Sequence, residues 1–137
     1  MPSQQTAPMI PHFCIDNAAA AVEFYKKAFG AEELMRVPDK DGKRIMHVEL
    51  LINGSLLYMH DDYPEMNGGK SKTPKGIGGS PVTMHLNVAN CDEAMKKAVD
   101  AGATVTMPAM DAFWGMRYGQ VRDPFGYEWA FAHPLKK

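Results

Sequence analysis

The chain repeats itself once, and this repeat limits the folds that are open to it. His12 and Asn17 recur as His85 and Asn90, both 73 positions further along the chain. In both halves the histidine lies in a short apolar run, and the asparagine precedes a helix-like pattern. Because the match covers a whole strand–helix unit, it indicates two copies of one supersecondary module.

Each copy contains one amphipathic helix. The first is predicted over Ala18–Phe29, between Asn17 as its N-cap and Gly30 as its stop. The second is predicted over Asp92–Ala101 and ends at Gly102. Asparagine accepts hydrogen bonds from the free amides of a first turn, and glycine tolerates the left-handed conformation that ends many helices.

Three strand-like runs follow each helix, separated by turn-forming residues such as Asn53-Gly54. The predicted strands are Glu32–Val37, Lys43–Ile52, Ser55–His60, Thr104–Met110, Arg117–Arg122 and Tyr127–Ala132. The sequence therefore predicts an α+β protein of two tandem βαβββ modules. We expect the modules to form a curved mixed sheet around a central cleft, with the helices on the outer faces.

The 137 residues suit a single domain, residues 1–137. Module 1 is expected over about residues 9–60 and module 2 over about residues 82–133. The stretch 61–81 between them is rich in glycine, lysine and proline, which is typical of a surface connector or a mobile lid. Residues 1–8 are polar and contain proline, so we expect a loose tail.

The composition excludes several classes of partner. A net charge of -1 offers no attraction to nucleic acid or to an anionic membrane. No signal peptide or membrane-spanning run is apparent. Cys14 and Cys91 have no metal-ligand spacing, and two distant cysteines fit a reduced, cytoplasmic setting better than a disulfide scaffold.

Alternation along the first strand of each module predicts which side chains face away from the helix. In the second module Met84 and Leu86 face the helix, whereas His85 faces away. In the first module His12 and Cys14 face away. Two such sheets related by a pseudo-twofold axis would enclose a cleft between their open faces. His12 and His85 would then look into this cleft from symmetric positions.

At this point the residues match a known family. The matching segments are Phe24–Ala31, Gly79–Val82, Ala101–Val105 and, most specifically, Phe113–Trp129 with its Phe-Trp-Gly and Asp-Pro-Phe-Gly motifs. The chain resembles the vicinal oxygen chelate superfamily of glyoxalase I, bleomycin-resistance proteins and extradiol dioxygenases, and is most similar to its PhnB-like branch. The resemblance implies paired βαβββ modules and a homodimer.

The resemblance also implies where a metal would be bound. Metal-using members supply one ligand from the first strand and one from the last strand of each module. The corresponding positions here are Ile10, Tyr58, Thr83 and Ala130. None of these is a good ligand for a divalent metal, so we expect no cofactor. A shifted set of His12, Glu49 and His85 keeps a divalent metal possible.

Eight side chains are candidates for binding a ligand in the cleft. They are His12, His47, Glu49, Tyr58, Thr83, His85, Trp114 and Tyr118. His12, His85 and Glu49 are also candidates for acid–base catalysis, because imidazole and carboxylate groups transfer protons near neutral pH. His60 and His133 lie near strand ends and are expected to face solvent, and Cys14 is expected to be buried and unreactive.

The favoured prediction is a protein that binds a small molecule in the inter-module cleft without the metal of the superfamily. The alternative is a metal-dependent lyase, isomerase or dioxygenase that uses the shifted ligand set. A third reading is an interaction subunit whose cleft is filled by its own side chains. Whether the protein is an enzyme is left open by the sequence, because one fold hosts several chemistries.

Overall fold

The computed structural model describes residues 6–136. The predicted tail, residues 1–8, therefore lies mostly outside the described part. Module 1 contains β1 (His12–Ile15), α1 (Ala18–Phe29), β2 (Glu32–Pro38), β3 (Ile45–Ile52) and β4 (Ser55–Asp61). Module 2 contains β5 (Thr83–Asn87), α3 (Cys91–Ala101), β6 (Thr104–Asp111), β7 (Met116–Arg122) and β8 (Glu128–Pro134). Both βαβββ modules are thus confirmed.

The helices begin and end as their flanking residues predict. The side chain of Asn17 accepts a hydrogen bond from the amide of Ala20, and Asn90 caps α3 through the amide of Glu93. Gly30 ends α1 with a φ of 68°, in the left-handed region that glycine adopts without strain. The helix α3 begins at Cys91, one residue earlier than predicted.

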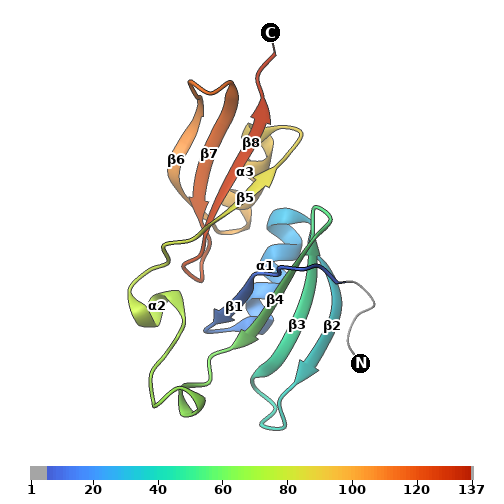
Figure 1. Cartoon of the computed structure of the whole chain (residues 1–137), viewed down its shortest axis with the longest axis vertical. Coiled ribbons are helices and arrows are strands. Elements are labelled where there is room, and N and C mark those ends of the chain that lie inside the picture. Colours follow the sequence, from blue (N-terminus) through green and yellow to red (C-terminus); the bar gives the residue numbers. More distant parts are fainter. Residues whose placement is uncertain (1–5, 137) are drawn as a thin grey trace.

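Each module forms its own four-stranded mixed sheet, with the strand orders β1-β4-β3-β2 and β5-β8-β7-β6. The first and last strands of each module pair in parallel, which places His12 beside Tyr58 and His85 beside Ala130. Figure 1 shows both helices behind their sheets, so each sheet has a helix-covered face and an open face. In β5 the partly buried Met84 and Leu86 pack against the core, whereas His85 is exposed, as predicted.

The arrangement of the modules differs from the expected one in two respects. The eight strands form two separate sheets, and α1 and α3 contact each other instead of lying on separate outer faces. The reason is a single core to which both helix-covered faces contribute. Within it, the ring of Phe29 on α1 lies 4.4 Å from the ring of Trp129 on β8.

A buried carboxylate also joins the modules. Asp123 accepts hydrogen bonds from the hydroxyl of Tyr25 on α1 and, over 2.9 Å, from Nε1 of Trp129. Its other oxygen accepts hydrogen bonds from the backbone amides of Phe125 and Tyr127, which stabilise the turn before β8. The carboxylate is only 3% exposed, so its four donors replace the water that burial removes.

The segment between the modules is folded more than a plain connector. It contains the 3₁₀ helix η1 (Pro64–Met66) and the short helix α2 (Pro74–Ile77), which is visible at the lower left of Figure 1. No helix among residues 6–136 is long and apolar enough to cross a lipid bilayer.

Candidate functional site

The open face of the first sheet gathers four rings. His12 comes from β1, His47 from β3, and Tyr58 and His60 from β4. The ring centroid of His12 lies 4.9 Å from that of His60, 5.8 Å from that of His47 and 5.9 Å from that of Tyr58. We call these four residues the ring cluster. It provides several hydrogen-bonding nitrogens and one hydroxyl within a few ångströms, as the polar part of a ligand site does.

Glu49 lies beneath one edge of the ring cluster. Its side chain is buried, and its Oε2 lies 3.0 Å from Nε2 of His47. Glu49 and Tyr58 are direct neighbours across β3 and β4. A buried carboxylate that orients an imidazole in this way fixes the direction in which the outer nitrogen points.

The histidines of the ring cluster influence one another. Burial, followed by the neighbouring imidazoles of His60 and His47, lowers the pKa of His12. Each factor disfavours a positive charge on His12. The cluster therefore presents a neutral His12 near neutral pH, which is able to accept or donate a hydrogen bond.

A pocket of about 310 Å³ opens at the end of the ring cluster. His60 and Cys14 belong to its wall, together with the apolar side chains of Met46 and Met66. Asp62 adds a carboxylate whose Oδ1 lies 3.6 Å from Sγ of Cys14. The volume is at the lower end of the range for small-molecule sites, and the lining combines apolar surface with a few polar groups.

The connector forms one wall of this pocket and is pinned to module 1. The guanidinium of Arg44 lies 4.1 Å from the ring centroid of Tyr63, and Arg44 also forms an ion pair with Glu65 at 2.8 Å. The hydroxyl of Tyr63 donates to Asp39 over 2.6 Å. These contacts tie Tyr63 and Glu65 of the connector to Asp39 and Arg44 of module 1.

Cys14 is the thiol nearest to the ring cluster. Burial, and then the carboxylate of Asp62, raise the pKa of the Cys14 thiol to about 11. Since the thiolate is the reactive form, this surrounding suppresses nucleophilic and metal-binding chemistry at the residue. The prediction of a buried, unreactive thiol is consistent with this geometry.

The open face of the second sheet carries a different group. The ring of His85 stacks on that of Tyr118 at 6.0 Å, and Trp114 contacts Tyr118 at 5.5 Å. Nε2 of Gln120 donates to the hydroxyl of Tyr118 over 2.8 Å, and Thr83 lies exposed on β5. We call His85, Trp114 and Tyr118 the second-sheet rings.

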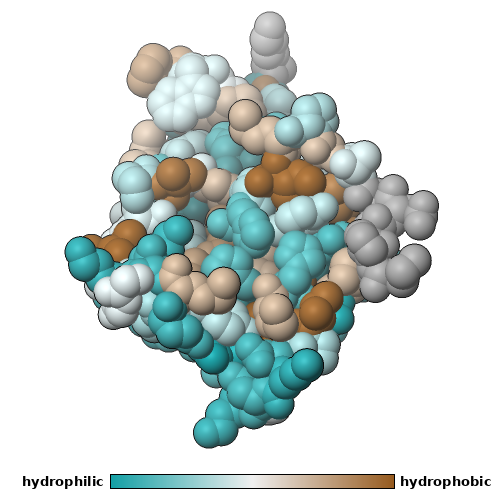
Figure 2. Space-filling view, turned by 60° about the horizontal axis from the view of Figure 1, so that its bottom comes forward, coloured by the Kyte–Doolittle hydropathy of each residue, from teal (hydrophilic) through white to brown (hydrophobic). Residues whose placement is uncertain are grey.

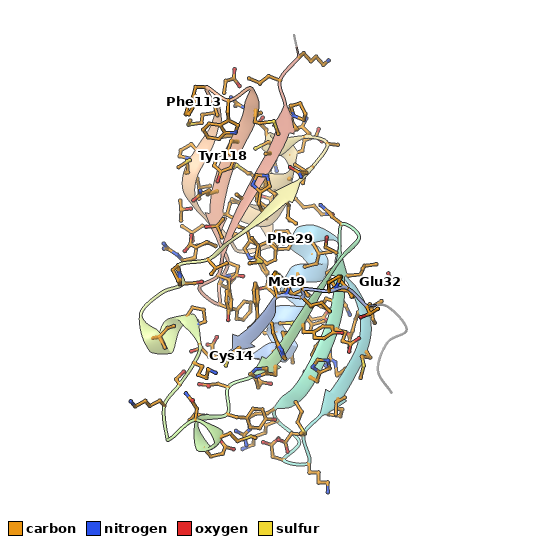
Figure 3. The ribbon with its side chains drawn as sticks, in the orientation of Figure 1. Met9, Cys14, Phe29, Glu32, Phe113 and Tyr118 are labelled. Carbon is orange, nitrogen blue, oxygen red and sulfur yellow. The ribbon has the colours of Figure 1, made fainter. Side chains whose placement is uncertain are left out.

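The predicted site residues are thus brought together in two groups instead of one. No ring contact among the described residues joins the ring cluster to the second-sheet rings. Figure 3 places Tyr118 in the upper module, well away from Cys14 in the lower one. The expected convergence of His12 and His85 on one cleft within the chain is therefore not observed.

His60 was missed by the sequence reasoning, and its expected solvent-facing position is wrong. It is half-buried and lies at the centre of the site, between the ring cluster and the 310 Å³ pocket. Alternation along β4 could have found it, because His60 lies two residues after Tyr58 on the same face. His133 is also half-buried, and its Nδ1 accepts the amide of Cys91 over 2.7 Å.

The four superfamily metal positions do not offer a donor set that fits a divalent ion. Tyr58 lies beside His12 and Glu49, and Ala130 is fully buried between its sheet neighbours. Ile10 and Thr83 supply no imidazole or carboxylate. Within residues 6–136, no group of three or more histidine, cysteine, aspartate or glutamate side chains is arranged to hold a metal ion, and this includes the shifted set.

A second pocket, of about 490 Å³, lies between the modules. Its floor contains the buried Leu57 and Trp129, and its rim contains Met9, Ser55 and His85. Met9 lies near the centre of Figure 3, where the two halves meet. Of the two symmetric histidines, only His85 reaches this inter-module pocket.

The fold and the site define a class of protein: paired βαβββ modules with open faces lined by rings and no metal donor set at the usual positions. Residues 9–131 match the Glyoxalase/Bleomycin resistance protein/Dioxygenase superfamily. The chain therefore belongs to this superfamily, and the resemblance seen in its motifs is confirmed at this level.

Individual relatives agree with this placement. The uncharacterized protein Rv0887c of Mycobacterium tuberculosis is 50% identical over 127 residues, which cover 93% of this chain and 74% of the relative. The X-ray structure of the gene product At5g48480 of Arabidopsis thaliana superposes with a TM-score of 0.72 at 31% identity, covering 93% of this chain and 99% of that chain. TioX from Micromonospora superposes with a TM-score of 0.69 at 24% identity, covering 96% and 98%, which shows the shared fold alone.

Proposed function

We propose that the protein binds a small amphipathic molecule on the open face of the first sheet, without the metal of the superfamily. The observation that carries the proposal is the ring cluster directly beside the 310 Å³ pocket, with His60 common to both. The imidazoles and the hydroxyl of Tyr58 would bind polar groups of the ligand. Met46 and Met66 would contact its apolar part, since methionine adapts to irregular shapes.

The mixed lining of the site favours an amphipathic ligand. The one face drawn in Figure 2 is mostly hydrophilic, and its hydrophobic side chains form separate patches. A purely apolar ligand would offer no hydrogen-bond partner to the ring nitrogens and the hydroxyl that it covers, which costs free energy on binding.

The second-sheet rings would complete the site from a second copy of the chain. Phe113 is 97% exposed and Trp114 51% exposed at the end of the second sheet, a costly position for two large aromatic side chains. In a symmetric dimer, the first sheet of each copy would face the second sheet of the other, so that each of two sites contains both groups. The cleft would still lie between a first and a second module, but these two modules would belong to different copies of the chain. We also place the protein in the PhnB-like branch and in the cytoplasm, on its motifs and its two separate reduced cysteines.

Two measurements test the dimer. Light scattering after size exclusion should give twice the chain mass of 15.2 kDa. The variant Trp114→Glu, which places a charge among the exposed aromatic rings, should shift the mass toward one chain. A wild-type mass near one chain would refute the dimer and the composite site together.

Metal content separates binding from the enzymatic alternative. Protein purified untagged and without chelator should contain no stoichiometric iron, nickel, zinc or manganese by plasma mass spectrometry. It should also take up none on dialysis. One bound ion per chain would refute the metal-free proposal and favour the metal-dependent lyase, isomerase or dioxygenase.

Ligand binding is tested by a thermal-shift screen of small aromatic acids and amides that carry more than one polar group, because the ring cluster offers several hydrogen-bonding atoms. Compounds that stabilise the wild type should lose this effect in His12→Ala and Tyr58→Ala. The matched control Thr104→Ala changes an exposed side chain at the start of β6 and should keep it. Equal stabilisation of all three variants would refute the ring cluster as the site.

A further inference from the structure

The repeat predicts two equivalent junctions between the modules, but the side chains of residues 6–136 fill only one of them. Strand pairing equates Tyr58 with Ala130, because these residues lie beside His12 and His85. Counting back three residues along the chain from each of these positions, Ser55 at the start of β4 corresponds to Tyr127, which directly precedes β8. By the same symmetry Leu86 on β5 corresponds to Phe13 on β1.

At the filled junction Tyr127 closes the space between the modules. Its ring stacks on that of Phe13 at 3.7 Å with an interplanar angle of 2°. Its hydroxyl accepts the amide of Cys14 over 3.0 Å and donates to the carbonyl of Cys14 over 2.8 Å. The phenol side chain of Tyr127 thus packs against module 1 and at the same time forms hydrogen bonds with the backbone of β1.

At the other junction both rings are missing. Ser55 replaces the phenol and Leu86 replaces its stacking partner, and both residues line the 490 Å³ inter-module pocket. The floor is apolar, since Leu57 is 4% and Trp129 is 2% exposed. His85 at the rim adds one imidazole, so the pocket combines a flat apolar interior with a polar edge.

We propose that this inter-module pocket is a separate binding site for a small phenol or a similar planar aromatic compound with one hydrogen-bonding group. The ligand would fill this junction with an aromatic ring, as Tyr127 fills the opposite one. Its ring would pack over Leu57 and Trp129, and its polar group would face the rim at His85. The volume of the pocket is within the range of small-molecule sites. The site shares His85 with the second-sheet rings, but it contains no residue of the ring cluster.

The probe that tests this site is p-cresol, the side chain of tyrosine as a free molecule. The chain has two tryptophans, and labelling with 5-fluorotryptophan gives one fluorine resonance for each. Trp129 reports on the inter-module pocket and Trp114 on the open face of the second sheet. We expect p-cresol to shift the Trp129 resonance in a saturable way, with a Kd in about the millimolar range for so small a ligand.

The variant Ser55→Tyr restores the residue of the filled junction and should raise the Kd by about tenfold or more. The control Ser80→Tyr adds the same side chain in the connector and should leave the Kd unchanged. Should Ser55→Tyr not fold, Ser55→Leu fills part of the same space with a smaller side chain and should weaken binding in the same direction. Three results would overturn the proposal. In the first, the Trp129 resonance does not shift, and in the second, only the Trp114 resonance shifts. In the third, p-cresol binds the wild type and the filled-pocket variant with the same Kd. None of these results bears on the ring cluster.

Discussion

Replacing Tyr127 by phenylalanine isolates the hydrogen bonds that join the modules. The change keeps the ring and its stack on Phe13 and removes only the hydroxyl. Two bonds to the backbone of Cys14 are lost, each contributing about 1 kcal/mol net. The amide and the carbonyl of Cys14 lie in a part-buried place, so the loss is not fully offset by water. We therefore expect the free energy of unfolding to fall by about 2 kcal/mol.

Urea denaturation followed by circular dichroism measures this change, and the thermal midpoint should fall by about 8 °C, at about 4 °C per kcal/mol for a chain of this size. The matched control is Tyr118→Phe, which removes one hydroxyl bonded to the side chain of Gln120 on the open face. It should cost less than about 1 kcal/mol. If Tyr127→Phe is as mild as this control, the hydroxyl does not secure the junction and the reasoning fails.

Three further predictions concern the side chains of Asp123, Cys14 and His12. Asp123→Asn should lower the free energy of unfolding by about 3 kcal/mol, because a side-chain amide cannot accept hydrogen bonds from all four donors. Urea titrations measure this change, and an unchanged midpoint would contradict it. Cys14 should react with iodoacetamide at pH 7 far more slowly than free cysteine, since its pKa is raised to about 11, and rapid alkylation of folded protein would refute the burial argument. The lowered pKa of His12 means that its unfolded form binds more protons below the ordinary value of 6.5. Its contribution to stability should therefore be lost as the pH falls from there through the folded pKa, and His12→Gln should flatten that part of the stability curve.

The sequence predicted those parts of the fold that depend on local chemistry. Asn17 and Gly30 mark the ends of α1 because capping and left-handed backbone are properties of single residues and their immediate neighbours. Alternation placed Met84 against the core and His85 away from it for the same reason. The repeat then extended these local predictions to a whole second module.

The relative position of the modules depended on long-range contacts that no local pattern contains. The contact of Phe29 with Trp129 joins residues 100 positions apart, and the bond from Tyr25 to Asp123 joins residues 98 apart. Both pairs bring the helix-covered faces together. Alternation identified His12 and His85 as candidates, but the division of the eight candidate side chains into two groups follows from these distant contacts. His60 was missed because its position near a strand end was given more weight than its face.

The positions at which the two halves differ are more informative about function than those at which they agree. His12 and His85 occupy equivalent places, yet one lies among rings that border a pocket and the other stacks on a tyrosine. The difference arises on the last strand of each module, where His60 of module 1 corresponds to Ala132 of module 2. A duplicated fold needs its helix caps in both copies, and Asn17 and Asn90 have stayed alike. Side chains on the open faces are free of that requirement, and their divergence allows one half to bind polar groups while the other contributes aromatic surface.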